Sequence, residues 1–177
     1  MLYFYFDFKD VEKQGQEKMI RSLILQLSSQ FGSTSQILEA LHSSCMNGGR
    51  QPTPDMLLAT LHHMMKFCEE TFIILDALDE CSERQELLED IEEIKHWTDV
   101  NLHILSTSRR EKDIEERIEP LAHEEGKIRI DSMHVNEDIR AYVHEKLQTD
   151  QKMKRWYKEP KVQQEIEDAL MEKADGM

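Results

Sequence analysis

The chain has 177 residues, 39% of them apolar and 33% charged, which suits one ordinary domain or part of a larger protein. Its formal net charge of −14 argues against a broad nucleic-acid-binding face and against binding to anionic membranes. No apolar run approaches the ~18 residues of a membrane span, and the three scattered cysteines form neither a disulfide framework nor a metal-ligand pattern, so we expect a cytoplasmic protein.

The first part of the chain predicts one aromatic strand followed by three helices, each with an apolar stripe at helical spacing. In chain order the expected elements are a strand at Leu2–Phe8, a helix through Met19–Gln30, a shorter helix through Ile37–Leu41 and a helix through Met56–Met65.

The rest of the chain alternates strands and helices. The expected elements are strands at Phe72–Leu75, Leu102–Leu105 and Lys127–Asp131, helices at Arg84–Trp97, Lys112–Ile118 and Val135–Leu147, and polar helical sequence from Gln148 onward. This alternation predicts an α/β fold with a mainly parallel sheet of about four strands flanked by helices. The apolar runs at 72–75 and 102–105 are typical of strands buried on both faces.

Carboxylates follow the first of these two strands directly. Phe72–Leu75 leads into Asp76, Asp79 and Glu80, and ligands of parallel sheets bind beyond the carboxyl ends of the strands. Asp76 would hold Mg²⁺ through water, and Asp79 or Glu80 would activate a water molecule. Alternatively, Asp79 and Glu80 only cap the acidic helix that follows.

A second polar group follows the next strand. Leu102–Leu105 ends in Ser-Thr-Ser-Arg, which places Arg109 at another strand end. A guanidinium group matches phosphate oxygens, so Arg109 is a candidate sensor of a terminal phosphate. Arg110 is expected to face solvent or to pair with Glu111.

These two segments, FIILDALDEC at 72–81 and ILSTSRR at 104–110, resemble the NACHT division of the STAND class of P-loop NTPases. With the opening YFYFDFKD, the chain is most similar to the version in fungal NOD-like receptors and ankyrin-repeat proteins, the nephrocystin-type N-terminal domain. The resemblance implies a partial nucleotide-binding domain over 1–148, and the start of a helical segment, truncated, over 149–177. It also implies an ATP-dependent oligomerisation switch, Mg-ATP as cofactor, and related NACHT proteins among the partners.

One family motif is missing from the sequence. There is no G-x-x-x-x-G-K-[ST], and the double glycine Gly48-Gly49 is followed by Arg50 in a loop between helices. In the family this loop precedes the strand at Leu2–Phe8 and cradles the phosphates. We therefore expect a truncated gene model or a remnant with an incomplete sheet, weak nucleotide binding and little or no ATPase activity.

Two other functions are compatible with the residues. The chain could be a pseudo-NTPase or interaction module that needs no nucleotide and associates through its sheet edge or acidic helices. A metal-dependent nuclease built on Asp76 is disfavoured by the net charge and by the lack of a lysine beside the carboxylates.

Overall fold

The computed structural model describes residues 1–32, 35–128 and 132–174, and the chain forms two compact units, Met1–His123 and Glu124–Met177. The first unit contains the sheet and the candidate site. Its elements in chain order are β1 (Leu2–Tyr5), α1 (Gln16–Gln30), α2 (Ser35–Ser44), α3 (Pro54–Met65), β2 (Thr71–Asp76), α4 (Arg84–Lys95), β3 (Leu102–Ser106) and α5 (Lys112–Ile118). A 3₁₀ turn, η3 (Leu78–Glu80), follows β2.

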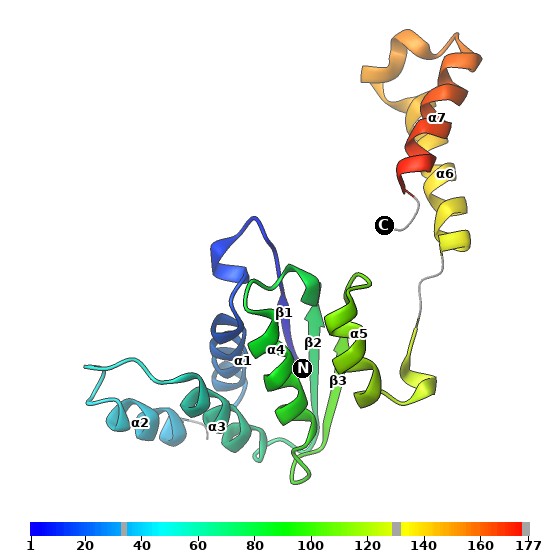
Figure 1. Cartoon of the computed structure of the whole chain (residues 1–177). Helices are drawn as coiled ribbons and strands as arrows, with labels where there is room; N and C mark the ends of the chain where they lie inside the picture. Colours follow the sequence, from blue (N-terminus) through cyan, green and yellow to red (C-terminus); the bar gives the residue numbers. More distant parts are fainter. Residues whose placement is uncertain (33–34, 129–131, 175–177) are drawn as a thin grey trace. The chain divides into compact units, whose positions relative to one another are not determined.

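The sheet of this unit is parallel, with its three strands in the order β1-β2-β3 (Figure 1). Leu2 lies opposite Ile73, and Ile73 lies opposite Ile104. Because the strands run in the same direction, their carboxyl ends meet at one end of the sheet. The expectation of an α/β fold with a parallel sheet flanked by helices is confirmed.

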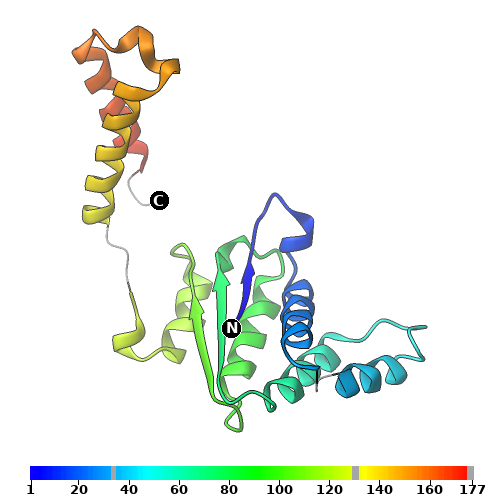
Figure 2. The ribbon, with the colours of Figure 1, turned by 180° about the vertical axis from the view of Figure 1, so that it is seen from behind.

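Within the described residues of the first unit, helices cover one face of this sheet. Leu2, Ile73 and Leu75 point into a core shared with apolar residues of α1, α3 and α4. In Figure 1 α4 stands in front of the strands with α1 beside it, and in Figure 2, from behind, no helix of the first unit stands in front of the strands.

The expected burial of both faces is therefore wrong for residues 72–75 and 102–105. Phe72 is 45% exposed and Leu105 is 57% exposed, and side chains alternate between the covered and the open face. Each strand keeps only its inward-facing residues in the core.

The amino end of α1 is capped from a distant part of the chain. Gly15 has no side chain to supply a cap, and Glu83 Oε2 instead accepts the N–H of Gln16 at 3.0 Å. A carboxylate at this position satisfies a free backbone donor and opposes the helix dipole favourably. The Gln16 side chain also donates to Asp90 on α4, so α1 and the start of α4 are held together at this end.

The third helix begins with a side-chain cap. Thr53 precedes α3 and its hydroxyl accepts the N–H of Met56 at 3.3 Å, with Pro54 at the first helical position. Leu61, Met64 and Met65 are fully buried and join the core beside α1.

The second unit is helical in its described part. It contains α6 (Ser132–Thr149), a 3₁₀ segment η6 (Gln151–Trp156) and α7 (Pro160–Ala174), which pack together. Glu167 is buried on α7, with His144 Nδ1 3.3 Å and Arg140 Nη1 3.6 Å from its carboxylate. The domain boundary expected after residue 148 falls inside α6, whereas the compact units divide after His123.

The expected fourth strand, Lys127–Asp131, has residues 129–131 outside the described part of the chain. Lys127 and Ile128, which are described, are not in a strand, so the described sheet has three strands instead of about four. In the described residues, no helix combines the length and the apolar composition that crossing a membrane requires.

Candidate functional site

The candidate site lies where β2 and β3 end. The structure brings together Asp76, Asp79, Thr107 and Arg109, which we call the strand-end cluster. The sequence predicts Asp76, Asp79 and Arg109 at one end of the sheet, and the hydrogen bonds that join them through residues 107–109 agree with this. The fourth predicted residue, Glu80, points to a different part of the fold.

Thr107 connects the two strand ends. Its hydroxyl donates to Asp76 Oδ1 at 2.5 Å and accepts the N–H of Ala77 at 3.0 Å. Its backbone N–H donates to the Leu75 carbonyl, and its own carbonyl accepts the N–H of Leu78, both at 3.0 Å. Since the hydroxyl–carboxylate bond is short and charge-assisted, Thr107 fixes the orientation of the Asp76 carboxylate.

Ala77 turns the chain sharply after β2. Its backbone is left-handed, with φ 58° and ψ 54°, a conformation that costs a residue with a Cβ atom about 1–2 kcal/mol. The turn directs Leu78 into the core, where it is 1% exposed, and starts η3. Asp79 is thereby brought against the loop after β3.

Asp79 binds that loop through both carboxylate oxygens. Oδ1 accepts the N–H of Arg109 at 3.0 Å and the hydroxyl of Ser108 at 3.3 Å, and Oδ2 lies 3.7 Å from Arg109 Nε. The Asp79 side chain is only 10% exposed, whereas that of Arg109 is 67% exposed. Asp79 thus supports the loop from a partly buried position, and the Arg109 guanidinium remains accessible to a ligand.

Glu80 is engaged elsewhere. Its Oε2 accepts the N–H of Phe8, just after β1, at 3.0 Å. Nearby, the Ser82 backbone N–H donates to the Gln14 carbonyl at 2.9 Å. The segment after η3 is therefore tied to the segment between β1 and α1, and this contact gives Glu80 a structural use that the sequence did not predict.

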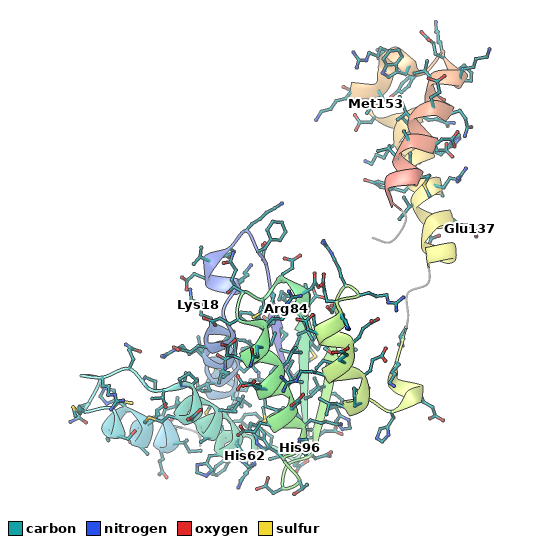
Figure 3. All side chains as sticks on the ribbon, in the orientation of Figure 1. Lys18, His62, Arg84, His96, Glu137 and Met153 are labelled. Atoms are coloured by element: carbon teal, nitrogen blue, oxygen red, sulfur yellow. The ribbon has the colours of Figure 1, made fainter. Side chains whose placement is uncertain are left out.

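Charged residues form ion pairs between the start of α4 and the start of α5. Arg84 Nε lies 3.2 Å from Asp113, and Arg84 Nη1 lies 3.6 Å from Glu111. Figure 3 shows Arg84 near the strand-end side of the first unit, with His62 and His96 toward the opposite end of α4. Arg110 pairs with Glu115 at 2.7 Å, and this carboxylate raises the pKa of Arg110. The alternative that Arg110 pairs with Glu111 is not what the structure shows.

Cys81 follows η3 and is buried beside the cluster. Burial raises the pKa of its thiol from 9.0 to about 11. A protonated thiol is a poor nucleophile and a poor metal ligand, so Cys81 contributes packing and not chemistry at neutral pH.

The residues present fit Mg²⁺ in a limited way. Asp76 offers a carboxylate at a strand end, oriented by Thr107, and Mg²⁺ often takes one or two protein carboxylates together with water and substrate phosphates. Within residues 1–32, 35–128 and 132–174, no three His, Cys, Asp or Glu side chains are grouped to hold a metal ion by themselves. Asp76 can supply one ligand, and water and phosphate oxygens would have to supply others.

Two shallow hollows lie away from the cluster. One is lined by residues of α2 and α3, including Ile37, Leu41 and Thr60, and the other by α2 and the loop that contains Gly48 and Arg50. Neither includes a residue of the strand-end cluster. Gly48 of the double glycine therefore borders a hollow beside α2 and not the ends of the strands.

Comparison with known proteins identifies a family for most of the chain. Residues 1–109 match the family model described as Nephrocystin 3, N-terminal. No curated protein and no solved structure matches the chain significantly. The matched segment runs from β1 to Arg109 and so contains the entire strand-end cluster.

Proposed function

The chain belongs to the nephrocystin 3 N-terminal family, and on this basis we propose that its strand-end cluster is the Mg²⁺-binding side of a nucleotide site in a NACHT-type signalling NTPase. The observation that carries the proposal is the network in which Thr107 orients Asp76 while Asp79 holds the loop of Arg109. It places an oriented carboxylate and an exposed guanidinium at the same end of a parallel sheet.

Each side chain has a distinct role in this proposal. Asp76 orients the metal through water, Thr107 holds Asp76, and Asp79 positions Arg109 toward a terminal phosphate. Bound Mg²⁺ would neutralise phosphate charge. Glu80 is the weaker candidate for activating water, since its carboxylate already binds the backbone of Phe8.

These residues lack the other half of a nucleotide site. The sequence has no glycine-rich loop with a following lysine to hold phosphates. We therefore expect the 177-residue chain to bind Mg-ATP weakly and to hydrolyse it little or not at all.

The site itself is tested by NMR with Mn²⁺-ATP as a paramagnetic probe. We expect selective broadening of the backbone amides of Ala77, Thr107 and Arg109, and its loss in Asp76→Ala. Glu39→Ala, which removes an exposed carboxylate on α2, is the matched control and should retain the broadening. Equal broadening across all acidic surfaces, or broadening that survives Asp76→Ala, would overturn the proposal.

The affinity is tested by calorimetry with Mg-ATP and by release of inorganic phosphate. We expect binding in the millimolar range or weaker and no phosphate release above a blank. A micromolar dissociation constant that Asp76→Ala abolishes would mean that this chain binds phosphates without the glycine-rich loop, contrary to the expectation of weak binding.

A second candidate function is a nucleotide-independent interaction module. The observation that favours it is the open face of the sheet, where Tyr3, Tyr5 and Phe72 are 47%, 50% and 45% exposed. Exposed apolar patches of this kind mark interaction sites. A monodisperse oligomer that Mg-ATP does not alter in light scattering would favour this function, and an aggregating chain would oppose it.

A further inference from the structure

The loop between α2 and α3 contains the asparagine–glycine pair Asn47-Gly48 (Figure 1). The backbone there is left-handed, with a positive φ at Met46 (54°), Asn47 (52°) and Gly48 (86°). A side chain at position 48 would meet two obstacles, since φ is positive and an added Cβ atom would lie 3.0 Å from His42 Nε2. The shape of the loop therefore requires a glycine directly after Asn47.

The two reactive groups of this pair are free. Both residues are exposed to solvent. In the described part of the chain, neither the side-chain amide of Asn47 nor the backbone N–H of Gly48 has a hydrogen-bond partner. The two backbone bonds that close the turn belong to the residues around the pair, from Gly49 to Met46 at 3.1 Å and from Arg50 to Cys45 at 3.0 Å.

We propose that Asn47 is a site of spontaneous deamidation through a cyclic imide formed with Gly48. The Gly48 nitrogen attacks Asn47 Cγ, a bond forms between these two atoms, and the bond from Cγ to Nδ2 breaks. Ammonia leaves with the proton that the Gly48 nitrogen loses. Water then adds to either carbonyl of the ring and opens it, which gives aspartate or isoaspartate. Water is the co-reactant, and no atom is oxidised or reduced.

The other two asparagines of the chain are less suited to this reaction. Ring closure needs a backbone nitrogen that no side chain shields and a backbone that can rotate. Asn101 precedes Leu102, whose branched side chain shields the nitrogen, and its carbonyl accepts the Thr71 N–H at 2.9 Å. Asn136 precedes Glu137 within α6, where the helical hydrogen bonds hold the backbone.

The closed turn slows the reaction only moderately. For the Gly48 nitrogen to reach Asn47 Cγ, the backbone must rotate, and the two bonds that close the turn must open. Each is an ordinary backbone hydrogen bond, so each slows the reaction by at most about tenfold. We therefore expect the folded chain to react no more than about a hundredfold more slowly than the unfolded chain.

The isoaspartate product should open the loop beside Cys45. This thiol is 4% exposed, although the hydrophobic core of the first unit does not include it. With Gly48 and Arg50, it lines the hollow between α2 and the loop. Isoaspartate lengthens the main chain by its Cβ atom, so the Arg50 N–H can no longer meet the Cys45 carbonyl in the same geometry. We expect Cys45 to become accessible to reagents in this form.

Peptide mapping of the 177-residue chain, aged at mildly alkaline pH, tests the site. The tryptic peptide that ends at Arg50 contains Asn47 as its only asparagine. Its mass should increase by the difference between an amide and an acid, about tenfold or more faster than for the peptides of Asn101 and Asn136. Chromatography should separate two products, of which endoproteinase Asp-N cleaves only the aspartate form. Equal rates in the three peptides, or aspartate as the single product, would overturn the proposal.

Matched variants and unfolding test the mechanism. Asn47→Gln should lose the mass increase, because glutamine would have to close a larger ring, and Asn101→Gln should keep it. The rate should rise with hydroxide concentration, since the Gly48 nitrogen must lose its proton. A chain unfolded in urea gives the rate without the turn. If the unfolded chain reacted and the folded wild-type chain did not, the turn would protect Asn47 and the proposal would be wrong. The wild-type chain decides this even if a variant fails to fold.

Iodoacetamide labelling of fresh and aged protein tests the effect on the loop. Labelling of Cys45 should become faster in proportion to the isoaspartate content, with the partly exposed Cys68 as the internal reference. Asn47→Asp carries the same new charge without the longer main chain, so its Cys45 should react as slowly as in fresh wild type. Unchanged labelling in aged protein, or equally fast labelling in fresh Asn47→Asp, would overturn the opening of the loop by isoaspartate.

Discussion

Asp79 holds Arg109 at both ends of the residue: one carboxylate oxygen accepts the Arg109 backbone N–H at 3.0 Å, and the other lies 3.7 Å from the guanidinium Nε. The backbone contact is the more important for stability. The Asp79 side chain is 10% exposed, and its loss would leave the Arg109 N–H without this acceptor.

The first prediction concerns this contact. Asp79→Ala should lower the free energy of unfolding by about 1–3 kcal/mol, since it removes the acceptor of the Arg109 N–H. Asp79→Asn should recover most of the loss, because its amide oxygen can still accept that bond. Urea denaturation measures both. If Asp79→Asn were as unstable as Asp79→Ala, the guanidinium contact and not the backbone bond would carry the effect.

The second prediction concerns the left-handed turn at Ala77. Ala77→Gly should stabilise the fold by up to about 1 kcal/mol, because glycine adopts a positive φ without the clash of a Cβ atom. Ala59→Gly, on the exposed side of α3, is the matched control and should destabilise the fold by about 1 kcal/mol. In thermal unfolding, the same substitution should therefore raise the stability at position 77 and lower it at position 59. A loss of stability in both variants would contradict a strained Ala77.

The third prediction concerns the edge of β1, where Gln26 on α1 accepts the N–H of Tyr3 at 3.0 Å and donates to the Tyr3 carbonyl at 2.7 Å. Gln26→Ala removes both bonds to Tyr3 and should cost about 1–2 kcal/mol of unfolding free energy. Gln30→Ala, which removes only one bond of 3.3 Å to the Met1 carbonyl, should cost less. Gln26→Ala should also increase self-association in light scattering, because it exposes the backbone groups of Tyr3 at the edge of β1. Equal stability of the two variants would show that Gln26 does not protect the edge.

The fourth prediction concerns pH. The pKa of Cys81 is raised from 9.0 to about 11 by burial. A raised folded-state pKa gives stability that is complete below the unfolded pKa and is lost as pH rises toward 11. We expect the unfolding free energy to fall through this alkaline range, and to fall less in Cys81→Ala.

Alkylation gives an independent readout for the same cysteine. At neutral pH the partly exposed Cys68 should react with iodoacetamide first, while Cys45 and Cys81, which are 4% and 5% exposed, react slowly until the chain unfolds. Rapid modification of Cys81 in the folded chain at neutral pH would contradict both its burial and its raised pKa.

The position of Asp76 near Arg109 was predictable from sequence, because parallel strands end at one end of a sheet. The role of Thr107 was less predictable from sequence. The hydroxyl side chains after Leu105 indicated a polar strand end, but they did not indicate which of them orients Asp76. The bond of Glu80 to the backbone of Phe8 joins residues 72 positions apart and leaves no periodic pattern in the sequence.

The open face of the sheet was missed for a different reason. The run Phe72–Leu75 is apolar at every position, and such a run predicts burial on both faces. The pattern of apolar residues indicates a strand, but it does not indicate whether helices cover one face of the sheet or both. In the first unit the helices lie on one face, so Phe72 is 45% exposed although its neighbours in sequence suggest a core residue.

The Glu83 carboxylate accepts the N–H of Gln16, although the two residues are 67 positions apart in the chain. The first turn of α1 therefore depends on a segment that must be brought to it by folding. The first turn of α1 has no cap of its own, since Gly15 precedes it. We therefore expect this turn to be frayed in the folding transition state until β2 and the start of α4 have assembled beside it. Folding kinetics of Glu83→Ala should then show faster unfolding with a nearly unchanged folding rate.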